Sequence, residues 1–456
     1  MQVKEGRNSM DFMRKYKCKG ALVLVAVLWI IVLMMIITAV VGQASRIDTR
    51  VSLVGAEQVR CKWACRAGVE TAVSVLGEDE RDSDSLEDLW SYNPEDFNDV
   101  ALDSVSFSVE VIDEAGKLNI NTTTKEQLIE LPDMTEEVAD SILDWRDGDD
   151  EMREGGAEAG YYLNLPYGYE PRNGDFKTIR ELLLVRDVTE VLFYGDTSNE
   201  SVSDYNAGWI NYLTCCSYDN NKDAEGNDRV NVNKAQEQEL VEKLGIRQSQ
   251  AKWLVENREF DSLGDLVAQQ GQGGGGSQSN QGSQNNQDNQ SSQQSTDTQT
   301  GQPRLGNNQQ QQQQPRQQEQ QVQAEPLDLA TFYEIVDKVT VTDDEQIQGR
   351  VNVNTASLFV LTALLEGNEG VAEDIISYRD GLSAGLVSIG ELKNVGSITT
   401  DIAGRFIDSV TTRSDVFTIR STARADATQT KRELEVIVDR SKSVPEMIYY
   451  RAGVGD

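Results

Sequence analysis

The acidic stretch from Asp147 to Glu158 has the residue types and spacing best suited to a chemical role. Oxygen donors occupy the first, third, fifth and twelfth places of these twelve residues, which is the ligand spacing of an EF-hand calcium loop. Met152 stands where such a loop needs glycine for its sharp turn. Carboxylates this close repel one another unless a cation lies among them. We therefore expect calcium, with a solvated acidic loop as the alternative, at some of Asp147, Asp149, Asp150, Glu151 and Glu158.

Overall composition narrows the chemistry further. The 456 residues carry a net charge of −34 and include no histidine. The lack of histidine excludes Ser-His and Cys-His catalysis and His-ligated zinc. No nucleophile motif is recognisable, so we do not expect an enzyme. The acidic excess disfavours nucleic acid and anionic membrane surfaces as partners, and it is compatible with divalent cations. Asp219–Asp223 is a second, weaker cation candidate.

Four cysteines follow the N-terminal region: Cys61, Cys65, Cys215 and Cys216. In an oxidising compartment they allow three pairings, and the sequence does not choose among them. Cys61 and Cys65 share a helix face, whereas Cys215 and Cys216 are adjacent and could bridge each other only with strain. A metal site is the weaker interpretation, because neither pair has Cys-x-x-Cys spacing.

An uncharged apolar stretch runs from Ala21 to Gly42 and predicts a membrane-spanning helix. Its 22 residues would make a helix of about 33 Å, enough to cross the hydrocarbon core. The basic leader that precedes it should stay in the cytoplasm, which sends the rest of the chain outward. Gln43 to Leu76 continues as an amphipathic helix that packs on a globular head.

An internal repeat organises the middle of the chain. Lys117-Leu-Asn-Ile-Asn is echoed by Arg229-Val-Asn-Val-Asn and again by Arg350-Val-Asn-Val-Asn. Further residues recur at constant offsets, which predicts three copies of one unit of two short helices and a third helical element. In each copy the Asn-x-Asn pair should accept from backbone N–H groups and cap the next helix, which the Thr and Ser residues also favour. The recurring residues are Asn119, Asn121, Leu128, Ala139 and Arg146; Asn231, Asn233, Leu240, Ala251 and Arg258; and Asn352, Asn354, Leu361, Ala372 and Arg379.

Paired short helices of this kind resemble the helix-hairpin-helix unit, which often binds duplex DNA. Charge argues against that function here. From Lys117 to Asp150 there are ten acidic residues against three basic ones, and such a surface repels phosphates. We therefore interpret the copies as a packing scaffold. A membrane-anchored DNA-binding protein of the competence type, built on these repeats, is the alternative function.

Alternating apolar and polar residues predict four strands at Val105–Ile112, Val416–Ala423, Arg432–Val438 and Met447–Tyr450. We expect one sheet with the helical copies inserted between its first and closing strands, an α+β fold. The Gln-, Asn-, Ser- and Gly-rich segment should be a flexible linker, and it could be a loop within one helical domain. The expected parts are 1–20, a leader; 21–42, the membrane helix; 43–115, the amphipathic helix and first part of the head; 116–269, repeats one and two; 270–325, the linker; 326–412, repeat three; and 413–456, the closing strands.

A basic leader that ends in Gly20 before an apolar helix resembles the class III signal of type IV pilins and type II secretion pseudopilins. The alternative is an ordinary signal anchor. The resemblance implies that a prepilin peptidase cuts after Gly20 and makes Ala21 the first residue. Most members carry glutamate at the fifth mature position, where it pairs with a neighbour's N-terminal amine, but Val25 stands there. A subunit without this carboxylate cannot make that pairing, which points to the end of a filament.

The landmarks Gly116–Asn121, Asp144–Asp147, Gly156–Tyr161 and Ile179–Leu182 resemble general secretion pathway protein K, a minor pseudopilin. The resemblance implies a structural role in the inner membrane with the head in the periplasm. It also implies minor pseudopilins of the I and J types as partners, and through them the major pseudopilin. Such a complex initiates assembly at the pseudopilus tip for export of folded proteins. The family binds calcium in its helical domain, which favours calcium here without identifying the ligands.

Overall fold

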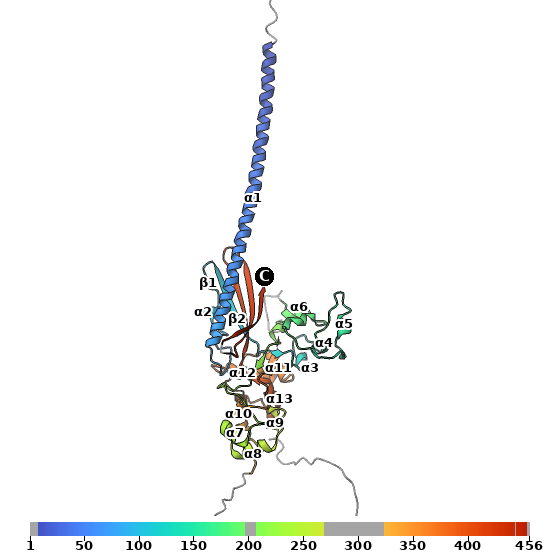
Figure 1. Cartoon of the computed structure of the whole chain (residues 1–456), viewed down its shortest axis with the longest axis vertical. Coiled ribbons are helices and arrows are strands. Elements are labelled where there is room, and N and C mark those ends of the chain that lie inside the picture. The colour runs from blue at the N-terminus through green and yellow to red at the C-terminus, as the bar shows by residue number, and fades with distance from the viewer. Residues whose placement is uncertain (1–7, 197–206, 269–322, 443, 454–456) are drawn as a thin grey trace, which may run out of the picture.

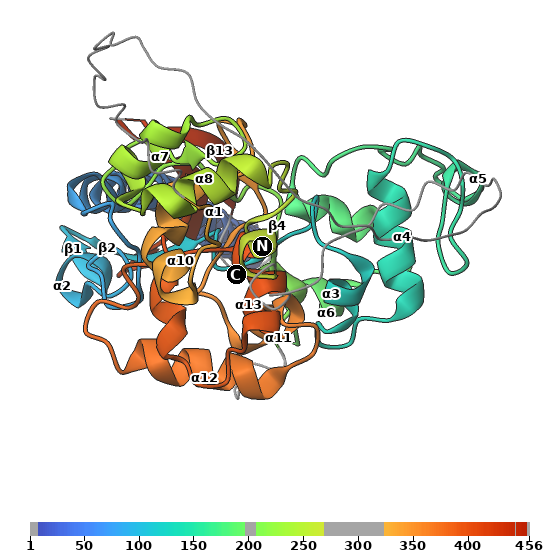
Figure 2. The same cartoon turned by 90° about the horizontal axis from the view of Figure 1, so that it is seen from below.

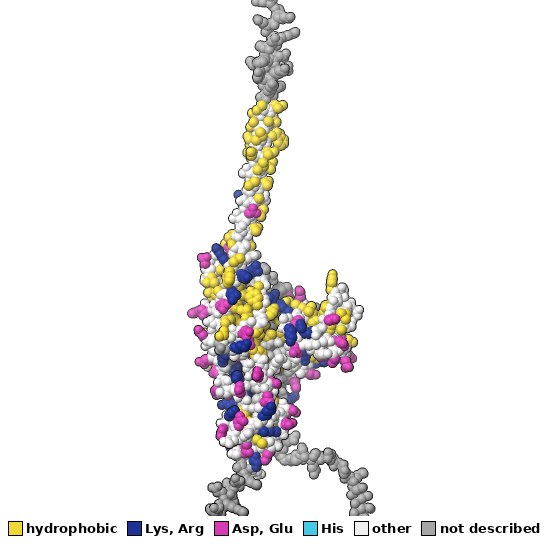
Figure 3. All heavy atoms as spheres, viewed as in Figure 1, with side chains coloured by type: hydrophobic (Ala, Val, Ile, Leu, Met, Phe, Trp, Pro, Cys, Tyr) yellow, Lys and Arg dark blue, Asp and Glu magenta, His cyan; other side chains and the backbone are white. Residues whose placement is uncertain are grey.

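The computed structural model describes residues 8–196, 207–268, 323–442 and 444–453. Helix α1 (Asn8–Glu78) is a straight stalk that runs into the head (Figure 1). Among the described residues, its segment from Leu22 is long and apolar enough to cross a membrane. Apolar side chains cover the upper stalk, whereas charges of both signs cover the head (Figure 3). The predicted membrane helix and its continuation into the head are thus one element.

The lower third of α1 packs on the sheet. Its buried residues recur every three or four positions, as expected for a helix with one apolar face. The amphipathic stripe is shorter than the sequence predicts, because Val51 and Val59 are 66% and 56% exposed. Small side chains on the buried face let the helix lie close to the strands. The apolar side chains of α1 in this core are Cys61, Ala64, Cys65, Val69, Ala72 and Leu76.

Five antiparallel strands form the sheet in the order β1 (Val100–Leu102), β2 (Val105–Asp113), β11 (Val416–Ala425), β12 (Lys431–Asp439) and β13 (Glu446–Gly453). The four predicted strands are all present, and β2 pairs with β11 across some three hundred residues of sequence. The prediction that the first strand and the closing strands share one sheet is therefore confirmed. The α+β fold class is confirmed with it.

The segment Gly77–Asp103, between α1 and β2, carries the short helix α2 (Pro94–Phe97) and the edge strand β1. Trp90 anchors this segment by an edge contact with Phe417, their ring centroids lying 5.0 Å apart. Sequence periodicity cannot reveal elements of three or four residues, because they are shorter than one repeat of either pattern.

Each repeat copy folds as two helices joined by a short turn, followed by a third element. The third element is a 3-10 helix in copies one and three. The interpretation of the pairs as helix-hairpin-helix units remains a prediction. The elements are α3 (Lys125–Ile129), α4 (Glu136–Arg146) and η1 (Ile179–Leu184); α7 (Glu237–Leu244), α8 (Gln248–Glu256) and α9 (Leu263–Ala268); and α11 (Leu358–Leu364), α12 (Glu369–Asp380) and η6 (Ile389–Asn394).

The recurring asparagines hold backbone in place, as copy three illustrates. The Oδ1 of Asn352 accepts from the N–H of Asn354 at 3.0 Å. Asn354 then brackets Leu386, accepting from its N–H at 2.8 Å and donating to its carbonyl at 2.9 Å. Arg379 donates to the carbonyls of the same strand region. Copies one and two repeat the bracket with Asn121 on Phe176 and Asn233 on Phe260.

Helix capping in the copies differs from the prediction for the asparagines but agrees with it for Thr and Ser. Thr124 caps α3 and Ser357 caps α11 through side-chain oxygens, whereas Gln236 before α7 makes no cap bond. The asparagines therefore accept backbone N–H groups, as expected, but do not cap the next helix. Their side chains are already committed to the bracket and to the turn that follows the strand.

Each copy closes with a two-stranded parallel ladder. The first Asn of each copy lies opposite a threonine that ends an aliphatic-Thr pair, in the pairs Asn119 with Thr214, Asn231 with Thr340 and Asn352 with Thr411. Residues up to Thr340 thus complete copy two, although the sequence alone assigns 326–340 to repeat three. The ladders are β3 (Leu118–Asn119) with β4 (Leu213–Thr214), β6 (Val230–Asn231) with β7 (Val339–Thr340), and β9 (Val351–Asn352) with β10 (Val410–Thr411).

The predicted linker lies mostly outside the described residues. Its last residue, Glu325, is described and is held by Ser249, whose carbonyl accepts from the Glu325 N–H at 3.1 Å. The linker itself remains a prediction. The connecting elements of the insertion are α5 (Ala159–Tyr162), α6 (Glu190–Tyr194), η3 (Trp209–Asn211), β5 (Tyr218–Asp219), α10 (Leu329–Ile335), η5 (Val336–Lys338), β8 (Ile347–Gln348), α13 (Thr400–Phe406) and η7 (Ile407–Ser409).

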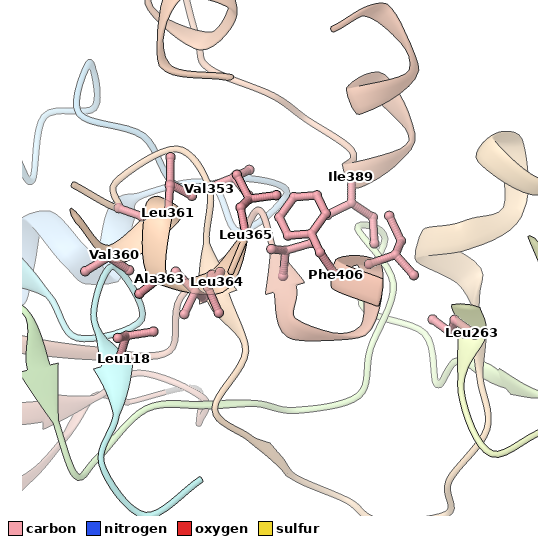
Figure 4. Packing of buried hydrophobic residues seen from close by; sticks show 14 of the residues in the cluster. Leu118, Leu263, Val353, Val360, Leu361, Ala363, Leu364, Leu365, Ile389 and Phe406 are labelled. Carbon is pink, nitrogen blue, oxygen red and sulfur yellow. The ribbon is translucent and has the colours of Figure 1, made fainter. Parts of the chain in front are cut away.

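A single apolar cluster joins the three copies. Figure 4 shows Leu118 of copy one beside Ala363 and Leu364 of copy three, with Leu263 of copy two farther along the same cluster. The part of copy one that contains α4 and α5 projects to one side of the molecule (Figure 2). This projecting lobe carries the acidic stretch.

Candidate metal centre

Three carboxylates meet where α4 ends and α5 begins. Asp144 lies in the last turn of α4, Asp147 is its C-cap residue, and Glu158 is the N-cap residue of α5. One oxygen from each lies within 4.8 Å of the others. Asp144 and Glu158 are buried, with 0% and 5% of their surface exposed. Asp144, Asp147 and Glu158 are called the acidic group below.

Arg153 is the cation that the protein itself supplies to the acidic group. Its Nη1 lies 2.5 Å from Asp144 Oδ1 and 2.5 Å from Asp147 Oδ2, and its backbone N–H donates to Asp144. Glu158 has no such partner: both of its carboxylate oxygens are buried and make no hydrogen bond, and Asp147 Oδ1 is in the same state. The Arg153 guanidinium thus pairs with two of the three carboxylates and leaves Glu158 without a partner.

The electrostatics of Glu158 reflect this imbalance. Burial, followed by the charges of Asp144 and Asp147, raises the pKa of Glu158 to about 7. Burial also raises the pKa of Asp144, although its contacts with Arg153 act in the opposite direction. The acidic group is therefore costly to keep fully ionised at neutral pH with Arg153 alone.

The backbone leaves room for the acidic group at one glycine. A Cβ on Gly156 would lie 1.8 Å from Asp144 Oδ2, so any other residue there would collide with the carboxylate. The carbonyl of Gly156 accepts from Arg186 Nη1 at 3.0 Å, which holds the returning chain against the group. Trp145 and Tyr162 pack edge to face at 5.2 Å and join the two helices that carry the acidic group.

The structure brings together two of the predicted ligands and separates the other three from them. Asp147 and Glu158 converge, but Asp149, Asp150 and Glu151 are exposed and lie outside the acidic group. The Oδ1 of Asp149 instead accepts from the N–H of Glu151 at 2.8 Å, and Asp150 accepts from an asparagine side chain. The charges of Asp150 and Asp149 still contribute to the raised pKa of Glu158.

Asp144 belongs to the group but is absent from the predicted ligands. A signal for it exists in the sequence, because Asp144 precedes Asp147 by three residues at the end of a helix, and residues so spaced lie on one helix face. The EF-hand spacing obscured this signal, since it treats the acidic stretch as one continuous loop. Asn173, whose Oδ1 is also buried without a partner, donates to the carbonyl of Asp149 at 3.0 Å.

The donor set suits a hard divalent cation. Carboxylate oxygens are the ligands that calcium prefers, and unpartnered buried oxygens are what a missing cation would leave behind. Asp144, Asp147 and Glu158 would hold the ion, which would supply the positive charge that Arg153 alone does not. The chemistry on offer is structural, since the ion would join the end of α4 to the start of α5.

The second cation candidate has a different arrangement. Asp219 is buried and paired through both oxygens with Arg229, at 2.8 and 3.1 Å, while Arg350 lies 3.8 Å away. Burial alone would raise the pKa of Asp219, but these two guanidinium groups lower it to about 2. Asp219 is therefore fully satisfied as an anchor for arginines, and we do not retain Asp219–Asp223 as a cation site.

The predicted processing residues all lie in the stalk. Gly20 and Ala21 lie within α1, and Val25 is 52% exposed there. Cleavage after Gly20 remains a prediction. Among the described residues, one apolar helix leads into a head made of an antiparallel sheet and a helical insertion, which is the architecture that the sequence predicts for a pilin-like protein.

The comparison with protein families is more specific. Residues 114–194, which contain the acidic group, match the family "Type II secretion system (T2SS), protein K". The predicted resemblance to protein K is therefore confirmed over these residues. This match is what supports a minor pseudopilin of type II secretion, which is proposed below. The single apolar helix is consistent with an inner-membrane anchor.

The chain was also compared with curated proteins and with solved structures. Among curated proteins, none matches this chain. A chain in the crystal structure of the GspK-GspI-GspJ complex from enterotoxigenic Escherichia coli is similar, with a TM-score of 0.47 and 11% identity over 89% of this chain and 99% of that chain.

Proposed function

We propose that this protein stands at the tip of a type II secretion pseudopilus, where it initiates or caps filament assembly for the export of folded proteins. Its partners would be minor pseudopilins of the I and J types and, through them, the major pseudopilin. A prepilin peptidase would release the leader after Gly20. The bulk of the chain would lie in the periplasm, anchored by one pass through the inner membrane.

The position of the insertion carries this proposal. Copies two and three lie beyond the C-terminal end of α1, on the side of the head away from the apolar stalk, whereas much of copy one projects sideways (Figure 1). A further subunit stacked along the stalk axis on that side of the head would collide with these helices. Val25 adds a second argument, because without a carboxylate at that position the helix cannot pair with a neighbour's N-terminal amine. Both features suit the end of a filament better than its shaft.

Localisation on assembled filaments tests the proposal. The chain should co-purify with I- and J-type pseudopilins when they are expressed together. N-terminal sequencing of the mature protein should begin at Ala21. Immunogold label on sheared pseudopili should lie at one end. Label spread along the shaft, or a different mature N-terminus, would refute the proposal.

The acidic group would support this function by keeping the projecting lobe in shape. Calcium held by Asp144, Asp147 and Glu158 would be a structural ion. The alternative function, DNA binding by the helix pairs, is tested by a gel shift at low salt. We expect no duplex binding, because the turn of copy one is flanked by acidic side chains.

A further inference from the structure

The two cysteine pairs lie on opposite faces of the sheet. Cys61 and Cys65 are buried with α1 on the face that carries Ile419 and Val436. Cys215 and Cys216 line a cavity with Thr418 of β11 and Ile437 of β12. These two residues pair with each other and are the sequence neighbours of Ile419 and Val436. Neighbouring strand residues point to opposite faces, so the sheet separates the two pairs. No disulfide can therefore join one pair to the other in the folded protein.

The thiols of Cys61 and Cys65 on α1 both donate hydrogen bonds to backbone carbonyls. Cys61 Sγ donates to the carbonyl of Thr430 at 3.5 Å, and Cys65 Sγ donates to that of Arg432 at 3.3 Å. Burial raises the pKa of the Cys65 thiol to about 11 and also raises that of Cys61. Both thiols are thus poor nucleophiles and are directed toward β12.

The second pair has the opposite character. The Sγ atoms of Cys215 and Cys216 lie 3.4 Å apart, and both residues are partly exposed. They line a cavity of about 220 Å³ between the segment from Lys177 to Arg180 and the strands β11 to β13. The hydrogen bond from Cys215 lowers the pKa of Cys216, which favours its thiolate, and the same bond raises the pKa of Cys215.

We propose that Cys215 and Cys216 form a vicinal disulfide that opens and closes with the ambient thiol-disulfide balance. The oxidant is a disulfide, either of a small thiol compound or of another protein. An oxidising compartment for the head rests on the proposed function above. The exchange itself depends only on the geometry of this pair.

The exchange has two steps. The Cys216 thiolate attacks one sulfur of the oxidant's disulfide, forming a mixed disulfide and releasing the other half as a thiolate that takes up a proton. Cys215, deprotonated, then attacks the sulfur of Cys216 and displaces the second half as a thiol. Two protein thiols are oxidised, and one disulfide of the oxidant is reduced to two thiols.

Adjacency makes this bond labile. Neighbouring Cα atoms are about 3.8 Å apart, below the roughly 4.4–6.8 Å that an unstrained disulfide spans. Strained disulfides are reduced more readily than structural ones. Closure would act on the segment that joins β4 to β5, where the carbonyl of Ser217 accepts from Asn119 Nδ2 at 2.9 Å. The redox state of Cys215 and Cys216 would thus act next to the hydrogen bond that Asn119 of copy one makes with this segment.

Equilibration of the full chain in glutathione buffers of graded ratio tests the proposal. After acid quenching and alkylation, the peptide that contains Cys215 and Cys216 should be lighter by two hydrogen atoms under oxidising conditions. It should carry two labels under reducing conditions, and the transition should fall within the glutathione range. Cys61 and Cys65 should be labelled only after unfolding. Two labelled thiols at Cys215 and Cys216 in the most oxidising buffer would overturn the proposal.

Single substitutions separate the roles of the two sulfurs. In Cys215→Ser the nucleophile Cys216 remains, so this variant should accumulate a mixed disulfide with glutathione. Cys216→Ser should do so at least several-fold more slowly. The controls Cys61→Ser and Cys65→Ser should leave the transition unchanged. Equal rates in the first two variants would contradict the assigned order. Because the buffer sets the redox balance, failure here leaves the pseudopilus proposal standing, and the reverse also holds.

Discussion

Replacing Glu158 by Gln tests whether the acidic group holds a cation. The pKa of Glu158 is raised from its ordinary value of 4.5 to about 7, so the folded protein binds its proton more tightly than the unfolded chain does. The stability that this group contributes is fully present below the unfolded pKa and is lost as the pH rises through the folded one. Full ionisation at neutral pH should cost the calcium-free protein about 2–3 kcal/mol, after allowance for solvent screening.

Calcium should reverse this loss. A ligand that binds only the folded state at a hundred times its Kd adds about 2.7 kcal/mol to the free energy of unfolding. At roughly 2–4 °C per kcal/mol, calcium should raise the Tm of the wild type by about 5–10 °C at pH 7.5. EDTA should remove the increase. The increase should be smaller near pH 5.5, where Glu158 is mostly protonated.

The variant Glu158→Gln keeps the shape of the side chain but not its charge. Its calcium-free Tm at pH 7.5 should exceed that of the wild type, and calcium should no longer raise it. The control Glu151→Gln removes an exposed carboxylate of the same stretch and should retain the full increase. Thermal melts by circular dichroism measure both. An undiminished calcium increase in Glu158→Gln would refute the assignment of the acidic group, and loss of the increase in Glu151→Gln would restore the continuous-loop interpretation.

Three further substitutions test other parts of the structure. Gly156→Ala should abolish the calcium increase in Tm because its Cβ collides with an aspartate of the acidic group, whereas Gly160→Ala, whose Cβ would enter open space, should not. Arg379→Met leaves two buried carbonyls without a donor and should lower the free energy of unfolding by about 2–3 kcal/mol in urea titrations. The exposed Arg405→Met should change it by less than about 1 kcal/mol. Asp219→Asn leaves two buried arginines unpaired and should cost about 3–5 kcal/mol at pH 7, while near pH 2 the variant and the wild type should converge because the wild-type carboxylate is itself being protonated.

The elements with long periodic patterns were predictable from the sequence. The apolar run before Arg46, the alternation in Val416–Ala423 and the three-fold recurrence of Asn-x-Asn each extend over enough residues to outweigh local noise. The pairing of β2 with β11 followed because a half-buried strand needs a partner and few candidates existed. Elements of two to four residues, such as β1 and the ladders that close each copy, carry no period and were not predictable.

The acidic group was only half predictable, for a different reason. Its members are brought together by the packing of α4 against α5 through Trp145 and Tyr162, not by one turn of chain. Sequence spacing can identify ligands of a continuous loop, but it cannot tell which carboxylates a tertiary contact brings together. Burial separates Glu158 from the exposed Glu151, and burial of single polar residues is a property of the fold.

Comparison of the copies indicates why copy one needs this group. In copies two and three the bracketed residue follows the arginine of the second helix closely, as Leu386 follows Arg379. In copy one the corresponding Phe176 follows Arg146 only after the long acidic insertion, yet Asn121 holds its backbone in the same way. The insertion must therefore close on itself to return the chain to its bracket. A cation between the end of α4 and the start of α5 would fasten the insertion at its base. The acidic group and the Asn121 bracket would then both return the chain to the position that the repeat requires.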